Sequence, residues 1–286
     1  MARIDVLKTY KIFIGGKFPR TESGRFFYIK NEKDDLLANM CLSSSKDFKN
    51  AVVEARKSQK IWANLSALNR GQILYRIAEM LEGRKEQFVN DLMLTGSTKS
   101  QAKKEIENSI DRVIYYAGWS DKFGQIFSSV NPVASDHFNF SSHQAVGVVS
   151  VIAPNASPLL GLVSLIAPII VGGNTCVVLA SEENPMVSIS FAEVLNTSDV
   201  PAGVVNILTG EREELIQYFA SHKDVNAIIY CGNNESQIKK IKDLSVENLK
   251  RTQIYKRINW DGENSQSPYF IEKCQEIKTT WHPIDF

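Results

Sequence analysis

The spacing of apolar residues divides the chain into two parts. Between residues 43 and 119, apolar positions recur every three or four residues, which is the period of a helix with one buried face. From residue 146 to residue 244, short runs of Val, Ile and Leu alternate with longer segments of helical pattern. Fully apolar strands that alternate with helices predict a parallel sheet covered by helices on both faces.

Three helices are predicted in the first part, over residues 43–62, 66–96 and 100–119. Serines that can cap a first turn begin the first helix, and Gly96 ends the second. The positions expected in the core are Phe48, Ala51, Val52 and Ala55 in the first helix, Ile73, Leu74, Ile77, Leu81, Phe88 and Leu92 in the second, and Ile106, Ile110, Val113 and Ala117 in the third.

Short β patterns lie before and after these helices. Residues 11–18, "KIFIGGKF", contain a Gly15-Gly16 turn and, together with "RFFYIKN" at 25–31, predict a hairpin or a pair of strands. From about Phe123 the helical period disappears, and "HFNFSSHQ" at 137–144 alternates like a strand with one polar face.

The second part predicts a Rossmann-type architecture. Strands are expected at 146–154, 174–181, 203–210 and 225–232, and helices at 157–173, 185–198, 211–222 and 234–244. Pro158 suits the first turn of the first of these helices. The fold class expected is therefore α/β, with a helical layer before the sheet.

Residues 147–181 contain no charged side chain, although charged residues make up 23% of the chain. A membrane-spanning helix needs about 20 consecutive apolar residues. Here Pro154, Asn155 and Pro158 interrupt the stretch, and residues 172–174 interrupt it again. We therefore expect a buried strand–helix–strand unit and no membrane role.

The composition, 286 residues of which 43% are hydrophobic, is that of a globular protein. A formal net charge of +1 provides no global field for nucleic acid, so no nucleic-acid partner is expected. The first residues carry charges at Arg3, Asp5, Lys8 and Lys11 and do not form a secretory signal, which favours a cytoplasmic location.

The four cysteines are far apart and form no C-x-x-C pair. Their spacing predicts neither a zinc site nor a disulfide framework, and we expect isolated buried thiols. They are Cys41, Cys176, Cys231 and Cys274.

Five blocks of the chain resemble the aldehyde dehydrogenase family in order and spacing. They are "YYAGWSDKFG" (115–124), "VGVVSVIAPNASPLLGLVSLIAPIIVGGNTCVVLASEENP" (146–185), "DVPAGVVNILTG" (199–210), "HKDVNAIIYCG" (222–232) and "ENLKR" (247–251). The resemblance implies a Rossmann-type NAD-binding domain, a catalytic domain with a nucleophilic cysteine, and a β extension that joins subunits.

The same resemblance suggests how the chain is organised. Residues 1–122 would form a hairpin and the helical layer, 123–145 oligomerisation strands, 146–260 the Rossmann-type core, and 261–286 a tail helix with a C-terminal oligomerisation strand. The family's catalytic domain, which carries the nucleophilic cysteine, has no counterpart between "ENLKR" and the tail "FIEKCQEIKTTWHPIDF". Cys274 would lie in the tail helix, as a structural thiol. Tyr255 stands where the family has its general-base glutamate.

The resemblance also implies NAD(P) as a cofactor and identifies the residues that would contact it. Leu179 replaces a lysine that binds the adenosine ribose, and Gln237 replaces a glycine near the pyrophosphate. Glu211, Glu213 and Glu214 are interpreted as first-turn acids that favour a helix dipole. The cofactor positions are Ile152, Ala153, Pro154, Leu179, Ser181, Glu182, Gly210, Gly232 and Asn233.

Asn155 has two interpretations. In the family its side-chain amide donates to the oxyanion that forms when the cysteine attacks the aldehyde. The alternative is a structural residue that satisfies backbone groups and caps the helix beginning near Pro158.

These features favour a catalytically degenerate member of the family that acts as a structural or regulatory subunit. It would form a homodimer or a hetero-oligomer with a full-length aldehyde dehydrogenase. The alternatives are an NAD(P)-dependent aldehyde oxidoreductase and a nucleotide-sensing module.

Overall fold

The computed structural model describes residues 7–31 and 34–284, so the charged start at Arg3 and Asp5 lies outside the described residues. At its centre is a sheet of five parallel strands in the order β10-β9-β6-β7-β8. The strands are β6 (Val148–Ile152), β7 (Thr175–Leu179), β8 (Val205–Leu208), β9 (Ala227–Cys231) and β10 (Arg251–Tyr255). After β8 the chain returns to the far side of β6, so the strand order reverses between β6 and β9.

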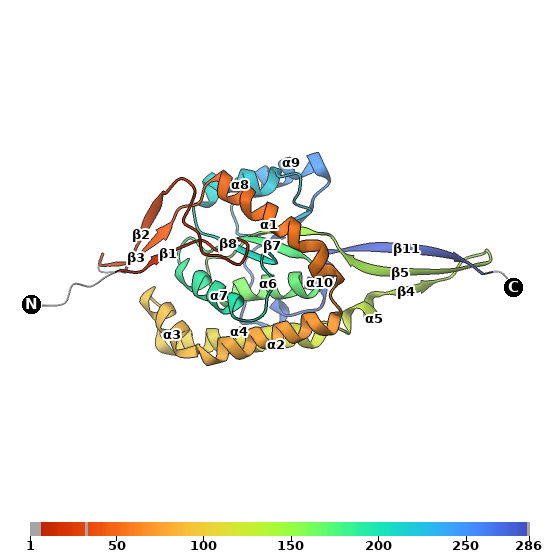
Figure 1. The fold of residues 1–286 in the computed structure, drawn as a ribbon, viewed down its shortest axis with the longest axis horizontal. Helices are drawn as coiled ribbons and strands as arrows, with labels where there is room; N and C mark the ends of the chain where they lie inside the picture. Colours follow the sequence, from red (N-terminus) through yellow and green to blue (C-terminus); the bar gives the residue numbers. More distant parts are fainter. Residues whose placement is uncertain (1–6, 32–33, 285–286) are drawn as a thin grey trace, which may run out of the picture.

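Helices cover both faces of this sheet, as Figure 1 shows. Val177 and Leu179 of β7 pack with α1, α8 and α9, whereas Cys176 and Val178 pack with the helices on the opposite face. The predicted α/β fold with a Rossmann-type sheet is confirmed. The helices are α1 (Ser45–Asn64), α2 (Ala67–Gly83), α3 (Lys85–Leu94), α4 (Lys99–Trp119), α6 (Leu160–Val171), α7 (Met186–Asn196), α8 (Arg212–Ser221) and α9 (Glu235–Ser245).

The uncharged stretch is the first strand–helix–strand unit of the sheet. Every residue of α6 is buried. No helix among the described residues is long and apolar enough to cross a membrane. The absence of charge is therefore explained by burial within the protein.

The strand pairing near the N-terminus differs from the prediction. β2 (Phe26–Lys30) pairs with β3 (Leu36–Cys41) and not with residues 11–18, and β1 (Thr9–Tyr10) runs parallel to β3. The Gly15-Gly16 turn does form, with mutual hydrogen bonds between Ile14 and Lys17. The prediction of a pair was wrong because β3, whose sequence "LLANMC" has no regular alternation, was not recognised.

Two further segments differ from expectation. The helix expected over 66–96 is interrupted at Arg84, which separates α2 from α3. The region after Phe123 begins with a short helix, α5 (Phe123–Phe127), before the strands start.

Strands β4 (Ser129–Asn131), β5 (His137–Ala145) and β11 (Gln275–Pro283) form a separate sheet in the order β11-β5-β4. We call these three strands the arm, because they project from one end of the protein in Figure 1. β11 pairs with β5 antiparallel over its whole length, from Gln275 opposite Ala145 to Pro283 opposite His137. The arm thus joins two segments that are distant in the sequence.

Residues 256–268 connect β10 to α10 (Tyr269–Glu272), and the short helices η1 (Val246–Asn248) and η2 (Glu263–Ser265) lie before and within this region. The buried Arg112 of α4 holds the connection by donating to the carbonyls of Trp260 and Ser265 and to the side chain of Gln266. Cys274 lies in the turn between α10 and β11. Its predicted place in a tail helix was wrong, because α10 ends two residues earlier.

Candidate functional site

The candidate site lies where the strand order reverses, at the carboxyl ends of β6 and β9. In open α/β sheets this is the place where a crevice forms and ligands bind. The loops that follow these two strands border a pocket of about 280 Å³, which we call the crevice. It is lined by Pro154, Asn155, Ala156, Arg212, Cys231, Gly232, Asn233, Tyr255, Arg257, Ile258 and Trp260.

The residues predicted to contact a cofactor fall into two groups. Pro154, Gly232 and Asn233 line the crevice together with Asn155. The remaining positions do not line it. Ile152 and Leu179 end their strands in the core and are fully buried, and Ala153, Ser181 and Gly210 are buried as well, whereas Glu182 is half-buried.

Asn155 connects the loop after β6 with the loop after β7. Its Oδ1 accepts hydrogen bonds from the backbone N–H of Glu182 at 3.2 Å and from Nη2 of Arg212 at 2.7 Å. Its Nδ2 donates to Oε1 of Glu183 at 2.9 Å. The Ser181 hydroxyl also donates to Oδ1, at 3.5 Å. Donors on the oxygen and a carboxylate on the nitrogen fix the orientation of the amide.

Asn155 does not cap α6. Residues Leu159 and Leu160, at the start of that helix, donate their backbone N–H groups to Oε1 of Glu105 at 2.9 and 3.2 Å. The structural interpretation of Asn155 was therefore right that its side chain accepts from a backbone N–H group. It was wrong that the side chain caps α6. A carboxylate from α4 supplies the cap because it reaches the free amides and their partial positive charge.

Arg212, the first residue of α8, lines the crevice and was not predicted from the sequence. The residue is 8% exposed, and its side chain donates to the carbonyl of Ala153 and to Oδ1 of Asn155. Its Nε lies 3.4 Å from Oε2 of Glu182. The sequence "EREE" at 211–214 is typical of a solvent-exposed first turn of a helix. Its pattern does not indicate that the arginine side chain points inward.

The thiol and phenol groups beside the crevice are poorly suited to nucleophilic or base chemistry. Burial raises the pKa of the Cys231 thiol, although the nearby Arg212 lowers it in part. Burial likewise raises the pKa of Tyr255, whose ring packs against Phe270 with centroids 5.3 Å apart. A thiol that stays protonated is a weak nucleophile.

Burial also raises the pKa of Cys176, and raises that of Cys274 to about 12. All four cysteines are free and buried, as predicted. The described residues contain no group of three or more His, Cys, Asp or Glu side chains that could hold a metal ion.

The start of α9 is the place where a dinucleotide would find backbone amides. These amides are already used, because Oδ1 of Asn234 accepts from the N–H groups of Ser236 and Gln237 at 3.0 and 3.2 Å. Gln237 in turn donates from Nε2 to Oε2 of Glu213 on α8 at 3.0 Å. The N–H groups of Ser236 and Gln237 are therefore not free to bind a dinucleotide.

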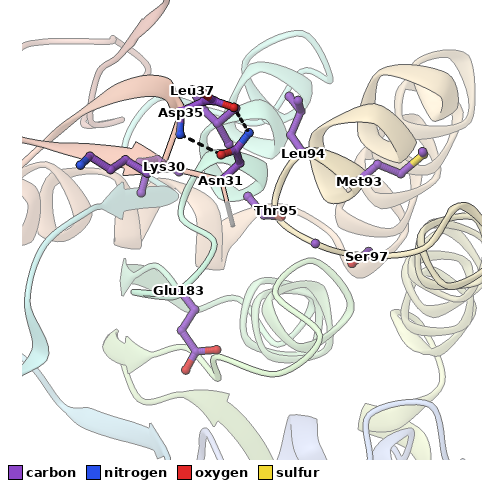
Figure 2. A pocket seen from close by; sticks show the side chains of 11 residues that line it. Lys30, Asn31, Asp35, Leu37, Met93, Leu94, Thr95, Ser97 and Glu183 are labelled. Atoms are coloured by element: carbon purple, nitrogen blue, oxygen red, sulfur yellow. Dashed lines mark hydrogen bonds between the residues drawn. The ribbon is translucent and has the colours of Figure 1, made fainter. Parts of the chain in front are cut away.

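A larger pocket, of about 490 Å³, lies away from the crevice between the β2–β3 region and the turn that follows α3 (Figure 2). Glu183 borders it, and Figure 2 shows its carboxylate pointing away from Asn31 and Asp35. That carboxylate accepts from Asn155. Glu183 therefore lies between the larger pocket and the crevice. The other lining residues are Ile29, Lys30, Leu37, Met93, Leu94, Thr95, Gly96 and Ser97.

Known proteins resemble this chain over most of its length. Mouse (Mus musculus) cytosolic 10-formyltetrahydrofolate dehydrogenase is 28% identical over 258 residues, covering 88% of this chain and 29% of the relative. The α-ketoglutaric semialdehyde dehydrogenase of Bacillus subtilis is 30% identical over 239 residues, covering 82% of this chain and 48% of the relative. The chain thus spans half or less of the length of these relatives.

A solved structure of an aldehyde dehydrogenase from Bacillus cereus, described as an NAD+ complex, superimposes with a TM-score of 0.82 at 26% identity. The alignment covers 87% of this chain and 51% of that one. The sequence model of the aldehyde dehydrogenase family matches residues 19–255, which include the whole parallel sheet and most of the residues that line the crevice. The chain belongs to the aldehyde dehydrogenase family.

Proposed function

We propose that this chain is a catalytically degenerate member of the family that acts as a structural or regulatory subunit through its arm. The observation that carries the proposal is the arm itself, in which β11 pairs with β5 along nine residues. The connection from β10 to β11 is short and held by buried hydrogen bonds to Arg112. The arm is thus fixed to the sheet domain without an intervening domain.

The exposed surface of the arm supports assembly with another subunit. β4 and β11 are the outer strands of the three-stranded sheet, and outer strands present unpaired backbone groups to a neighbour. Large apolar side chains lie exposed on them, among them Val130, Ile277 and Trp281. Exposed apolar groups on a projecting sheet favour a protein partner. We propose a second copy of the chain or a full-length aldehyde dehydrogenase as that partner.

The chemistry beside the crevice supports catalytic degeneracy. Cys231 is the cysteine that lines the crevice, and burial keeps its thiol protonated. The aromatic side chain of Tyr255 stands at the position that the resemblance gives to the general base. Asn155 is engaged by Arg212, Glu182 and Glu183. A cytoplasmic location remains a prediction from the sequence.

The test is co-expression with a full-length aldehyde dehydrogenase from the same genome. The tagged chain should copurify with that enzyme or elute as a dimer, and native mass spectrometry gives the stoichiometry. The proposal would be contradicted if the chain is monomeric at micromolar concentration and does not copurify with the enzyme.

The alternative is an NAD(P)-dependent aldehyde oxidoreductase. Family membership and the presence of Asn155 at the crevice favour it. The purified chain would then reduce NAD or NADP in the presence of an aldehyde, and Cys231→Ser would abolish this turnover. No turnover by the chain alone with either cofactor, together with copurification of a partner enzyme, would favour the subunit role.

A further inference from the structure

The guanidinium of Arg212 lies across the place where the strand order reverses. Its Nη2 donates to the carbonyl of Ala153, just after β6, and its Nη1 donates to the carbonyl of Cys231, at the end of β9, at 3.5 Å. These two carbonyls border the gap in which a Rossmann-type sheet receives its ligand. The side chain therefore bridges the two strand ends from the inside of the crevice.

Further contacts hold the arginine in this position. Oδ1 of Asn155 accepts from Nη2 at 2.7 Å, and the carboxylate of Glu182 lies 3.4 Å from Nε. The other oxygen of Glu182 accepts from the backbone N–H of Arg212 at 2.6 Å. A buried guanidinium with this many acceptors loses all of them if it swings out, so it stays in place.

The same contacts use the polar groups that a nucleotide would need. Glu182, which the resemblance assigns to the adenosine ribose, is bound to both the backbone and the side chain of Arg212. At the start of α9, Asn234 accepts from the backbone N–H groups of Ser236 and Gln237, and Gln237 joins α9 to Glu213 of α8. Polar groups at both places are thus engaged by residues of the chain itself.

We propose that Arg212 blocks the crevice of this chain to dinucleotides, so that removing its side chain allows NAD to bind. Arg212 acts by occupying space and by holding Glu182 and Asn155. With alanine at this position, the carboxylate of Glu182 and the carbonyls of Ala153 and Cys231 become accessible from the crevice. The inference concerns the nucleotide site alone and does not depend on assembly through the arm.

The experiment compares NAD binding by the full chain and by Arg212→Ala, using isothermal titration calorimetry. We expect no binding to the unaltered chain at about 1 mM NAD, and an affinity gain of about tenfold or more in the variant. Arg25→Ala is the matched control. It also removes a guanidinium paired with a glutamate, Glu214 of α8 at 2.6 Å, but Arg25 does not line the crevice. This control should bind no NAD.

A second variant guards against loss of folding. Arg212→Gln keeps a polar side chain near Asn155 but is too short and uncharged to bridge the strand ends, so it should also admit NAD. Circular dichroism establishes that each variant is folded. A dissociation constant below about 1 mM for NAD and the unaltered chain would overturn the proposal. So would folded Arg212→Ala and Arg212→Gln chains that bind no better than the unaltered one. Copurification with a partner enzyme is a separate readout, so failure of the subunit role is distinguishable from failure of this inference.

Discussion

Glu105 shows how a single residue fixes the geometry of the crevice from outside it. Its carboxylate accepts from the backbone N–H groups of Leu159 and Leu160, and thereby sets where the loop containing Asn155 turns into α6. Burial raises the pKa of Glu105, while the two backbone hydrogen bonds lower it. The cap lies 54 positions from the helix that it serves, so local capping patterns in the sequence could not reveal it.

Replacing Glu105 with alanine leaves these amides of α6 without a partner. We expect a loss of about 1–2 kcal/mol in the free energy of unfolding. Urea denaturation measures it. Glu107→Ala removes a carboxylate from the exposed face of the same helix, where it pairs with Lys85, and should change stability very little. Equal effects of the two substitutions would contradict the capping role.

Lys250 is a buried cation with a pH-dependent consequence. Burial lowers its pKa from 10.5 to about 8, and its ammonium donates to the carbonyls of Ala220 and His222 at the end of α8. Between these two pKa values the unfolded chain binds a proton that the folded chain has released. Because the unfolded state binds more protons there, this residue makes stability rise with pH through that window.

We therefore expect the melting temperature of the unaltered protein to improve, relative to Lys250→Met, as the pH is raised from about 7.5 to 9.5. Differential scanning calorimetry at several pH values gives the two curves. Lys239→Met, an exposed position on α9, should follow the unaltered protein. Parallel curves for the unaltered protein and Lys250→Met would contradict the lowered pKa.

At the scale of elements, most helices and the strands buried on both faces followed from periodicity, whereas strands of mixed pattern such as β3 and β10 did not. Ile152 and Leu179 end strands that are buried on both faces, so their apolar runs are unmistakable. β10, "RTQIY", is an edge strand in which only Tyr255 is buried, and its mixed pattern carries no such signal. The inward orientation of Arg212 could not be predicted either, because the carbonyls of Ala153 and Cys231 that accept from it come together only in the folded chain.

Arg112 determines how firmly β10 is connected to the arm. It is buried and donates to Trp260, Ser265, Gln266 and Ser164, which joins residues 256–268 to α4 and α6. Arg112→Ala would leave several buried acceptors unpaired. We expect a loss of about 3 kcal/mol or more in the free energy of unfolding.

Limited proteolysis should then show faster cleavage within residues 256–268 of the Arg112→Ala chain. Arg251→Ala removes an exposed arginine that pairs with Glu276 and should have a smaller effect on both measurements. A cleavage pattern unchanged by Arg112→Ala would show that other contacts hold the connection.

At the scale of the whole molecule, the sheet of β1, β2 and β3 and the arm lie at opposite ends (Figure 1). Only the arm is proposed to bind a partner. Trp281 on the arm and Tyr28 on β2 are similarly exposed, at 57% and 54%. Trp281→Lys should weaken assembly about tenfold or more, because a charge replaces an apolar contact. Tyr28→Lys should leave it intact. Light scattering across a dilution series measures both, and equal behaviour of the two variants would argue against the arm.

The pairing of β5 with β11 also has a consequence for the order of events during synthesis. Ser141 and Thr279, which touch across this pair, are separated by 138 positions. A ribosome releases β5 well before β11, and the intervening sheet domain can fold in that interval. Until β11 emerges, one side of β5 is open to a strand from another nascent polypeptide. Exchange of strands between chains translated close together is therefore a route to assembly that is open only during translation.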